Sequence, residues 1–148
     1  MIGGYLLVRS EGKPYGLPVA RVLEVSDATE VLTVPRRLPA VRGLTPMRGR
    51  LVPLIHLGAF LAGRAAPESS GVRTIVLVEL KGQQVAFEVD DADAVVREQP
   101  LAVPQGQSLP WATGALGAGA CERAGWTRHT SPAARTIATR TSTAHRLP

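Results

Sequence analysis

The chain has 148 residues, a formal net charge of +5, and 45% hydrophobic residues. This length suits one domain or two small subdomains that share a core, and the apolar share is sufficient to build that core. The single cysteine, Cys121, excludes an intramolecular disulfide, and no apolar run reaches the ~20 residues that a membrane-spanning helix needs. The N-terminus also has no basic leader of the signal-peptide type, so we expect a cytoplasmic protein without direct membrane insertion.

The positive charge is concentrated in the C-terminal part. Residues 1–110 contain twelve basic and eleven acidic side chains, whereas residues 111–148 contain five arginines and one glutamate. After Gly114 the sequence is rich in Ala, Thr, Arg and Gly and shows neither helical nor strand periodicity. We therefore predict a folded domain over residues 1–114 and a basic, disordered tail over residues 115–148.

The first part of the domain predicts strands around one short helix. Residues 5–10 (YLLVRS) form a run of strand formers, EGKPYG supplies turn residues, and YGLPV resumes the strand. In residues 17–25 the apolar side chains recur at i, i+3 and i+4, which predicts about two helical turns, with Pro18 tolerated at the start.

The next predicted elements are two strands, a helical turn and a linker. Residues 30–35 alternate in polarity and predict a strand, and residues 50–57 predict another. Pro53 lies inside the second of these, so we expect it at an edge or a bulge. Residues 58–63 can form one helical turn, and the small, polar residues 63–72 predict a linker.

A hairpin is the clearest element of the second half. Residues 73–80 and 83–89 are apolar strand-like runs joined across Lys81-Gly82. DDADAVVREQ predicts a further turn and strand, and PQGQSLPWATG reads as a loop. Several short strands separated by turn signals indicate a mainly β protein built from small barrels.

The stretch VRGLTPMRGRLVPLIHL (41–57) resembles the signature of the CheW family, the coupling proteins of bacterial chemosensory arrays. YGLPVARVLEV upstream, RTIVLVELKGQQVAFEVDDADAVV downstream and WATG (111–114) are similar to further family elements in the same order, so the resemblance covers residues 5–114. It implies two intertwined, SH3-like β-barrels with short helices, no cofactor and no catalysis. The first barrel would span about residues 12–62, and the second about 5–10 plus 73–114.

The resemblance also implies partners. Family members bridge the cytoplasmic tip of methyl-accepting chemoreceptors to the regulatory domain of a CheA-type histidine kinase, which is itself CheW-like. The receptor helix would lie in the groove between the barrels, and the kinase would dock mainly on the first barrel. The positions that match the receptor-binding groove are Val22, Glu24, Val25, Gly43, Met47 and Arg48, and Val19 matches a kinase-side contact.

These positions have suitable chemistry. A groove for a helix needs an apolar floor, which Val22 and Val25 can supply. Gly43 permits close approach of a backbone, and Arg48 offers five N–H donors in a planar fork.

Three departures from the family pattern affect the prediction. Pro46 stands where an Asn is expected, and His56 stands where an Asp would cap the following helical turn, a loss worth ~1 kcal/mol. The tail supplies neither the expected last strand nor the C-terminal helix, so the second barrel would lack its closing strand. An accessory adaptor that binds the receptor but not the kinase is therefore one hypothesis.

Other functions find less support in the sequence. His56 has no Asp, Ser or Cys in a supporting pattern, VDDAD (89–93) lacks the ligand spacing of an EF-hand, and GALGAGA has no following helix, so we predict no enzyme, metal or cofactor site. Cys121 has no nearby base within a patterned segment. The alternative is a small-barrel nucleic-acid-binding protein that uses the basic tail, although the folded part has few aromatic side chains for base stacking.

Overall fold

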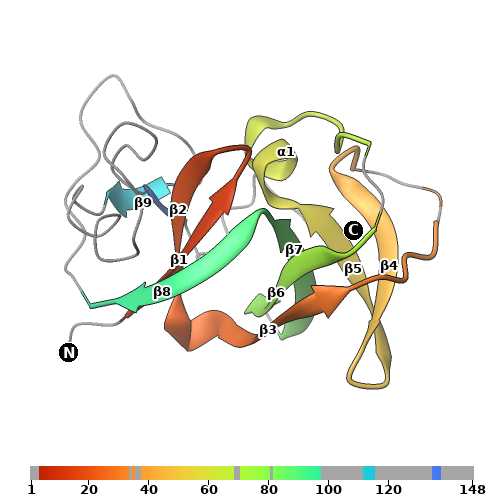
Figure 1. Ribbon diagram of the computed structural model, residues 1–148, viewed down its shortest axis with the longest axis horizontal. Coiled ribbons are helices and arrows are strands. Elements are labelled where there is room, and N and C mark those ends of the chain that lie inside the picture. Colours follow the sequence, from red (N-terminus) through yellow and green to blue (C-terminus); the bar gives the residue numbers. More distant parts are fainter. Residues whose placement is uncertain are drawn as a thin grey trace.

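The computed structural model describes residues 4–33, 35, 38–68, 71–80, 82–97, 112–115 and 135–137. These residues form two five-stranded sheets and two short helical segments (Figure 1). Sheet A contains, in spatial order, β8 (Asp91–Val96), β1 (Tyr5–Ser10), β2 (Lys13–Pro18), β10 (Arg135–Ile137) and β9 (Ala112–Ala115). Sheet B contains β3 (Val22–Ala28), β6 (Arg73–Leu80), β7 (Gln83–Val89), β5 (Arg50–His56) and β4 (Val41–Met47). The helical segments are the 3-10 turn η1 (Val19–Arg21) and the helix α1 (Leu57–Ala62).

The expected mainly β fold is confirmed, and several predicted elements occur where the sequence places them. β1, β5, α1 and the hairpin β6–β7 match their predicted ranges closely. The hairpin pairs Leu80 with Gln83, so the two residues between them form the connection. Pro53 pairs with Leu44 of β4 but lies before the part of β5 that pairs with β7, which begins at Leu54. Pro53 therefore sits where β5 has only one paired neighbour, as a residue without an N–H requires.

Sheet B has a hydrophobic core on each of its faces. One core lies between the two sheets and includes Leu6 and Val8 of β1 together with Val76, Val78 and Phe87 of sheet B. The other core lies on the opposite face, and its buried members are Ala28, Met47, Val52, Leu54, Ile75, Leu77 and Ala86. Because β6 and β7 are covered on both faces, they read as continuous apolar runs in the sequence.

Sheet B curls so that the chain after β3 meets the edge strand β4. Leu32 and Leu44 form an isolated bridge in which each N–H donates to the other carbonyl, at 2.7 and 2.9 Å. Thr45 is buried, and its Oγ1 donates to the carbonyl of Glu30 at 2.8 Å. The two edges of sheet B are thus linked through the segment after β3, although no continuous ladder joins them.

Two predicted elements are wrong. Residues 17–25 form the end of β2, the turn η1 and the start of β3, rather than two turns of helix. Residues 30–35 do not form a strand, and the only pairing among the described ones is the bridge at Leu32. The helical spacing is misleading because a register shift between Val22 and Glu24 breaks the alternation expected of a strand.

The division of strands between the two units also differs from the expectation. The hairpin β6–β7 belongs with β3, β4 and β5 in sheet B, whereas β2 belongs with β1 in sheet A. The reason is pairing: β6 takes β3 as its second neighbour, and β7 takes β5. Such partners lie far apart in the sequence, so local patterns do not identify them.

Part of the predicted tail is a strand. β10 lies between β2 and β9, parallel to β2 and antiparallel to β9. The expectation that residues 115–148 supply no strand is therefore wrong at Arg135–Ile137, and residues 112–114 of the WATG motif lie in a strand rather than a loop. The rest of the predicted disordered tail, apart from Ala115, lies outside the described residues. Neither helical segment in the described part is long and apolar enough to cross a membrane.

Candidate functional site

Two residues of the predicted groove form a direct contact. Nε of Arg48 donates to Oε2 of Glu24 at 2.5 Å, and the arginine side chain is 54% exposed. Glu24 belongs to β3 and Arg48 to the turn between β4 and β5, so the ion pair joins the two edges of sheet B. A guanidinium held on one side by this carboxylate keeps its other N–H groups available to a docking partner.

The turn that carries Arg48 is a tight two-residue hairpin connection. Met47 pairs with Arg50, and the intervening Arg48 and Gly49 have φ angles of 50° and 76°. Two successive left-handed residues are typical of the type I′ turn, whose twist matches the flanking strands. This geometry positions Arg48 at the tip of the hairpin, where it reaches β3.

The valines of the predicted site lie toward the face between the sheets. Val22 pairs with Val78 and Val25 pairs with Val76, and both partners belong to the core between the sheets. Because directly opposed residues point to the same face, Val22 and Val25 share that side. Val22 packs partly against the core, whereas Val25 is 45% exposed. The two valines therefore supply an apolar rim beside sheet A.

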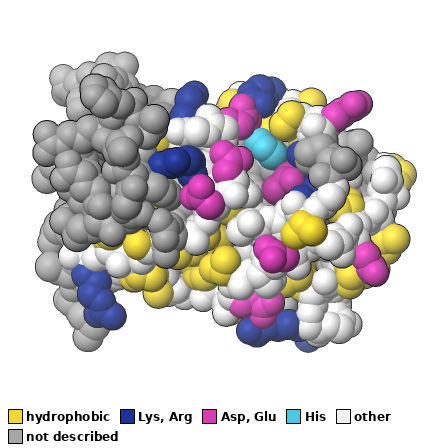
Figure 2. Space-filling view, viewed as in Figure 1, with side chains coloured by type: hydrophobic (Ala, Val, Ile, Leu, Met, Phe, Trp, Pro, Cys, Tyr) yellow, Lys and Arg dark blue, Asp and Glu magenta, His cyan; other side chains and the backbone are white. Residues whose placement is uncertain are grey.

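The structure also places the exposed Val95 close to Val19, the predicted kinase-side residue. A Cβ placed on Gly4 would lie 3.2 Å from Cγ1 of Val95 and 3.5 Å from Cγ2 of Val19, so both valines border one point of the surface. Val95 is 54% exposed and Val19 is 37% exposed. The sequence did not single out Val95, and its only signal was an apolar residue in the short strand after an acidic turn. On the face in Figure 2, hydrophobic side chains are interspersed with charged ones.

Two predicted residues lie inside the protein rather than in an exposed groove. Met47 is only 6% exposed. Alternation along β4 turns its side chain into the core on the face of sheet B that is opposite the core between the sheets. Gly43 is buried, and a Cβ on it would lie 2.2 Å from the carbonyl oxygen of Leu32. The close backbone approach expected at Gly43 therefore exists, but the approaching backbone is the chain's own.

A second apolar surface lies on the outer face of the hairpin β4–β5. Leu44 pairs with Pro53, Pro46 pairs with Leu51, and Leu32 adjoins Leu44 through the isolated bridge. Leu32 and Leu51 are 52% and 53% exposed. These five residues form an apolar patch across three chain segments, which we call the hairpin patch.

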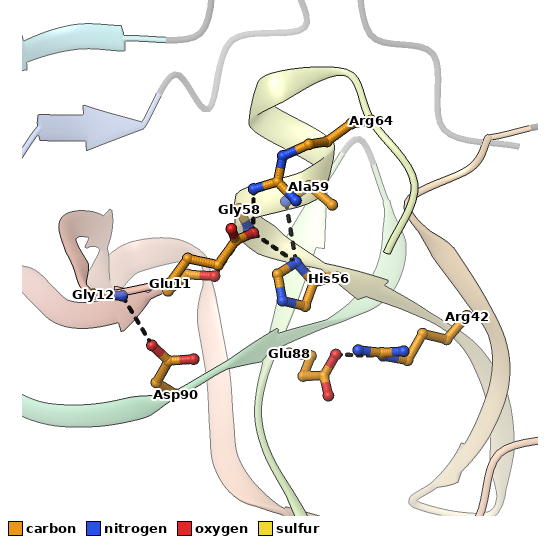
Figure 3. A network of polar contacts seen from close by, with 10 residues as sticks. Glu11, Gly12, Arg42, His56, Gly58, Ala59, Arg64, Glu88 and Asp90 are labelled. Atoms are coloured by element: carbon orange, nitrogen blue, oxygen red, sulfur yellow. Dashed lines mark hydrogen bonds and ion pairs between the residues drawn. The ribbon is translucent and has the colours of Figure 1, made fainter. Parts of the chain in front are cut away.

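Polar contacts connect the β1–β2 turn of sheet A to the start of α1 (Figure 3). Oγ of Ser10 accepts a hydrogen bond from the N–H of Gly58 at 3.0 Å, and the guanidinium of Arg64 pairs with the carboxylate of Glu11. A Cβ on Gly58 would lie 2.9 Å from Oε1 of Glu11, so the turn and the helix fit closely. The hydrogen bond from Arg64 holds the pKa of Glu11 below its usual value, although partial burial opposes this.

His56 caps α1, which corrects the expectation that the cap is lost. Nδ1 of His56 accepts a hydrogen bond from the N–H of Ala59 at 3.1 Å, and the side chain is buried. Nδ1 also lies 3.7 Å from Oε1 of Glu11, a distance at which an ion pair would require a protonated ring. Burial lowers the pKa of His56, more than the nearby carboxylates raise it, so the neutral ring and the cap prevail.

A buried carboxylate pairs with two arginines next to this junction. Oε2 of Glu88 lies 2.5 Å from Nε of Arg42, and its Oε1 lies 3.0 Å from Nε of Arg73. All three side chains are about nine-tenths buried, with exposed fractions of 10%, 10% and 11%. The cluster connects β4, β6 and β7 on a face where an unpaired charge would be costly.

Metal-binding clusters do not occur in the part of the chain that the structure describes: no three His, Cys, Asp or Glu side chains there converge on one point. His129, His145 and Cys121 lie outside the described residues, as does most of the basic segment on which the nucleic-acid alternative depends. That alternative stays a prediction. The arrangement described above offers surfaces for docking, a salt-bridged hairpin tip and a polar junction between the sheets.

Comparisons with known proteins bear on the fold and the family of the chain. No curated protein sequence matches the chain. Among solved structures, the scaffolding protein TtCheW from Thermoanaerobacter tengcongensis has a similar fold, with a TM-score of 0.68 at 19% sequence identity over 93% of this chain and 89% of that one. The sequence model of the CheW-like domain matches residues 4–123, which extends past the expected boundary at residue 114. Proteins of this family are non-enzymatic adaptors and scaffolds in chemotaxis signal transduction, and the chain belongs to the CheW-like domain family.

Proposed function

We propose that this protein is a non-enzymatic, cytoplasmic adaptor that couples the cytoplasmic tips of chemoreceptors to a CheA-type histidine kinase. Membership of the CheW-like domain family supports the adaptor role. The placement of exposed apolar residues on two separate surfaces supports two partners. Signal would pass as a bias between docked arrangements, without a chemical step in this chain.

The receptor would dock at the rim between the sheets. Val22, Val25 and Val95 provide apolar contacts there, which a helix laid into a groove requires, and Val19, which the resemblance matches to a kinase-side contact, adjoins Val95 at Gly4. Glu24 belongs to the same strand β3, but it pairs with Leu77 of the opposite core, so its ion pair with Arg48 lies toward the other face of that strand and would offer N–H donors to a partner that reaches past its edge. This exposed valine rim is the observation that carries the proposal for the receptor.

The kinase regulatory domain would dock on the hairpin patch. Leu32 and Leu51 are each more than half exposed there, and Pro46 and Pro53 remove backbone donors that water would otherwise solvate. Contiguous exposed apolar side chains of this kind mark interaction surfaces. The patch therefore favours an adaptor with both partners over the accessory form that binds the receptor alone.

Two matched substitutions test the assignment. We expect Val25→Asp to weaken binding of a receptor-tip fragment by at least tenfold, the loss of about 1.4 kcal/mol, and to spare binding of the kinase regulatory domain. Leu51→Asp should have the reverse effect. Val72→Asp, at a valine that is 68% exposed just before β6, serves as the control and should change neither affinity.

Isothermal titration calorimetry with the full chain gives both affinities. Binding of the receptor fragment without binding of the kinase domain would support the accessory form. If the unmodified chain binds neither partner, the adaptor proposal is wrong.

A further inference from the structure

The imidazole of His56 stands at the contact between the two sheets. His56 is the last residue of β5 in sheet B, caps α1 through Ala59, and faces Glu11 in the β1–β2 turn of sheet A (Figure 3). Ser10, the last residue of β1 before this turn, accepts the N–H of Gly58 on its Oγ. The ring of His56 thus lies close both to the first turn of the helix, at Ala59, and to the β1–β2 turn, at Glu11.

The state of Nδ1 decides whether the cap exists. Nδ1 accepts the N–H of Ala59 with its lone pair, and a proton on Nδ1 would occupy that lone pair. Ala59 is fully buried, so its N–H would then have no water to replace the lost acceptor. A protonated Nδ1 becomes a donor, and the acceptor within reach is Oε1 of Glu11, 3.7 Å away.

Charged groups of both signs surround the ring. Glu11 faces it from the β1–β2 turn, Glu88 from β7, Arg42 from β4 and Arg64 from the segment after α1. Arg42 and Arg64 are each paired with one of these carboxylates. The carboxylates raise the pKa of His56 and the arginines lower it, and burial is the largest influence, so the pKa lies below the usual 6.5.

We propose that His56 is a proton-sensitive latch between the β1–β2 turn of sheet A and helix α1. With the ring neutral, Nδ1 caps the helix, and Glu11 remains paired with Arg64. With the ring protonated, the Ala59 hydrogen bond breaks, and the imidazolium turns toward Glu11 and competes with Arg64 for its carboxylate. The contact between the sheets then loosens at this point.

The direction of the pH effect follows from the lowered pKa. In the unfolded chain the histidine takes up its proton near pH 6.5, whereas in the folded chain it does so only at lower pH. The latch therefore contributes its full stability above pH 6.5. This contribution falls as the pH decreases from 6.5 to the folded-state pKa. Below that pKa, His56 is protonated in the folded protein as well, and its hydrogen bond to Ala59 is broken.

The test uses the full-length chain with His129→Gln and His145→Gln, so that His56 is its only histidine. NMR titration should give a pKa for His56 below 6.5. As the ring titrates, the hydrogen-exchange protection of the Ala59 amide should drop at least tenfold, while that of the Val76 amide in the core strand β6 should stay constant. Latch opening predicts this local loss, whereas general unfolding would reduce both.

A conservative variant provides the second measurement. Asparagine caps helices well and does not titrate, so His56→Asn in the same background should flatten the loss of denaturation midpoint between pH 7 and pH 5. The proposal is overturned if His56 titrates at or above 6.5, if Ala59 protection is unchanged through the titration, or if the His56→Asn variant keeps the same pH profile.

Discussion

Nε of Arg48 lies 2.5 Å from Oε2 of Glu24, and this ion pair joins the tip of the hairpin β4–β5 to β3 at the opposite edge of sheet B. The isolated bridge between Leu32 and Leu44 joins the same two regions farther along. The curled shape of sheet B is therefore held at two points. One is a backbone contact, and the other is a charged contact at the surface where partners are expected to dock.

Arg48→Ala should separate binding from stability. The pair is largely exposed, so we expect its loss to reduce the free energy of unfolding by only about 0.2–1 kcal/mol. Binding of the receptor fragment should weaken by about tenfold, because the hairpin tip loses both its donors and its tether to β3. Urea denaturation and calorimetry measure the two effects. Arg50→Ala, at the next exposed arginine, is the control, and an equal loss of binding there would argue against a specific role for Arg48.

Gly43→Ala should destabilise the fold by displacing the segment that closes sheet B. The added Cβ would lie 2.2 Å from the carbonyl oxygen of Leu32, and φ is 154° at this position. We expect a loss of about 1–3 kcal/mol in the free energy of unfolding, as for other overpacked sites. Gly63→Ala provides the comparison, because φ there is also positive but nothing lies within 4 Å of the new Cβ. If both variants change stability equally, backbone strain rather than the Leu32 contact explains the effect.

Glu88→Gln should leave two buried guanidinium groups without their carboxylate. Removing one member of a buried charge cluster typically costs about 3–5 kcal/mol, and we expect a loss of this size in denaturant unfolding. Glu79→Gln on the exposed side of β6 makes the same chemical change and should cost less than about 0.5 kcal/mol. A small effect at Glu88 would mean that Arg42 and Arg73 find other partners.

Arg64→Gln should raise the pKa of Glu11. The hydrogen bond from Arg64 is the main cause that lowers this pKa below 4.5 in the folded protein. The contribution of Glu11 to stability is therefore present above pH 4.5 and is lost as the pH falls through the folded-state pKa. In the variant, carboxyl NMR titration should show Glu11 closer to 4.5. Lys13→Gln is the control, because Lys13 is the weakest of the named causes, and a larger shift there would contradict the assignment.

The sequence predicts best those elements whose signal is local. The hairpin β6–β7 was predicted correctly because two apolar runs flank a two-residue connection. Residues 17–25 were predicted wrongly because the apolar spacing around the bulge at Val22 imitates a helix. The pairing of β3 with β6 then decides the conformation, and a local pattern contains no information on that partner.

The candidate site shows the same division. The contact between Glu24 and Arg48 brings together two residues that the family resemblance had selected, yet their salt bridge was not predicted. Val95 was missed because its relation to Val19 depends on how β8 and η1 meet at Gly4. The cap at His56 was predicted to be absent because His56 replaces the Asp of the family pattern, whereas burial keeps its Nδ1 unprotonated and able to accept the Ala59 N–H.

The position of β10 has a consequence for the order in which the chain is made. Every strand of sheet B lies between residues 22 and 89. All the strands that pair in this sheet have therefore been synthesised once residue 89 has been made. Sheet A instead places Arg135–Ile137 between β2, near the start of the chain, and β9. During synthesis β2 can therefore gain this neighbour only after residues 135–137 have been made. The valine rim on β3 therefore lies between sheet B, whose strands are all synthesised early, and sheet A, whose last strand is synthesised later.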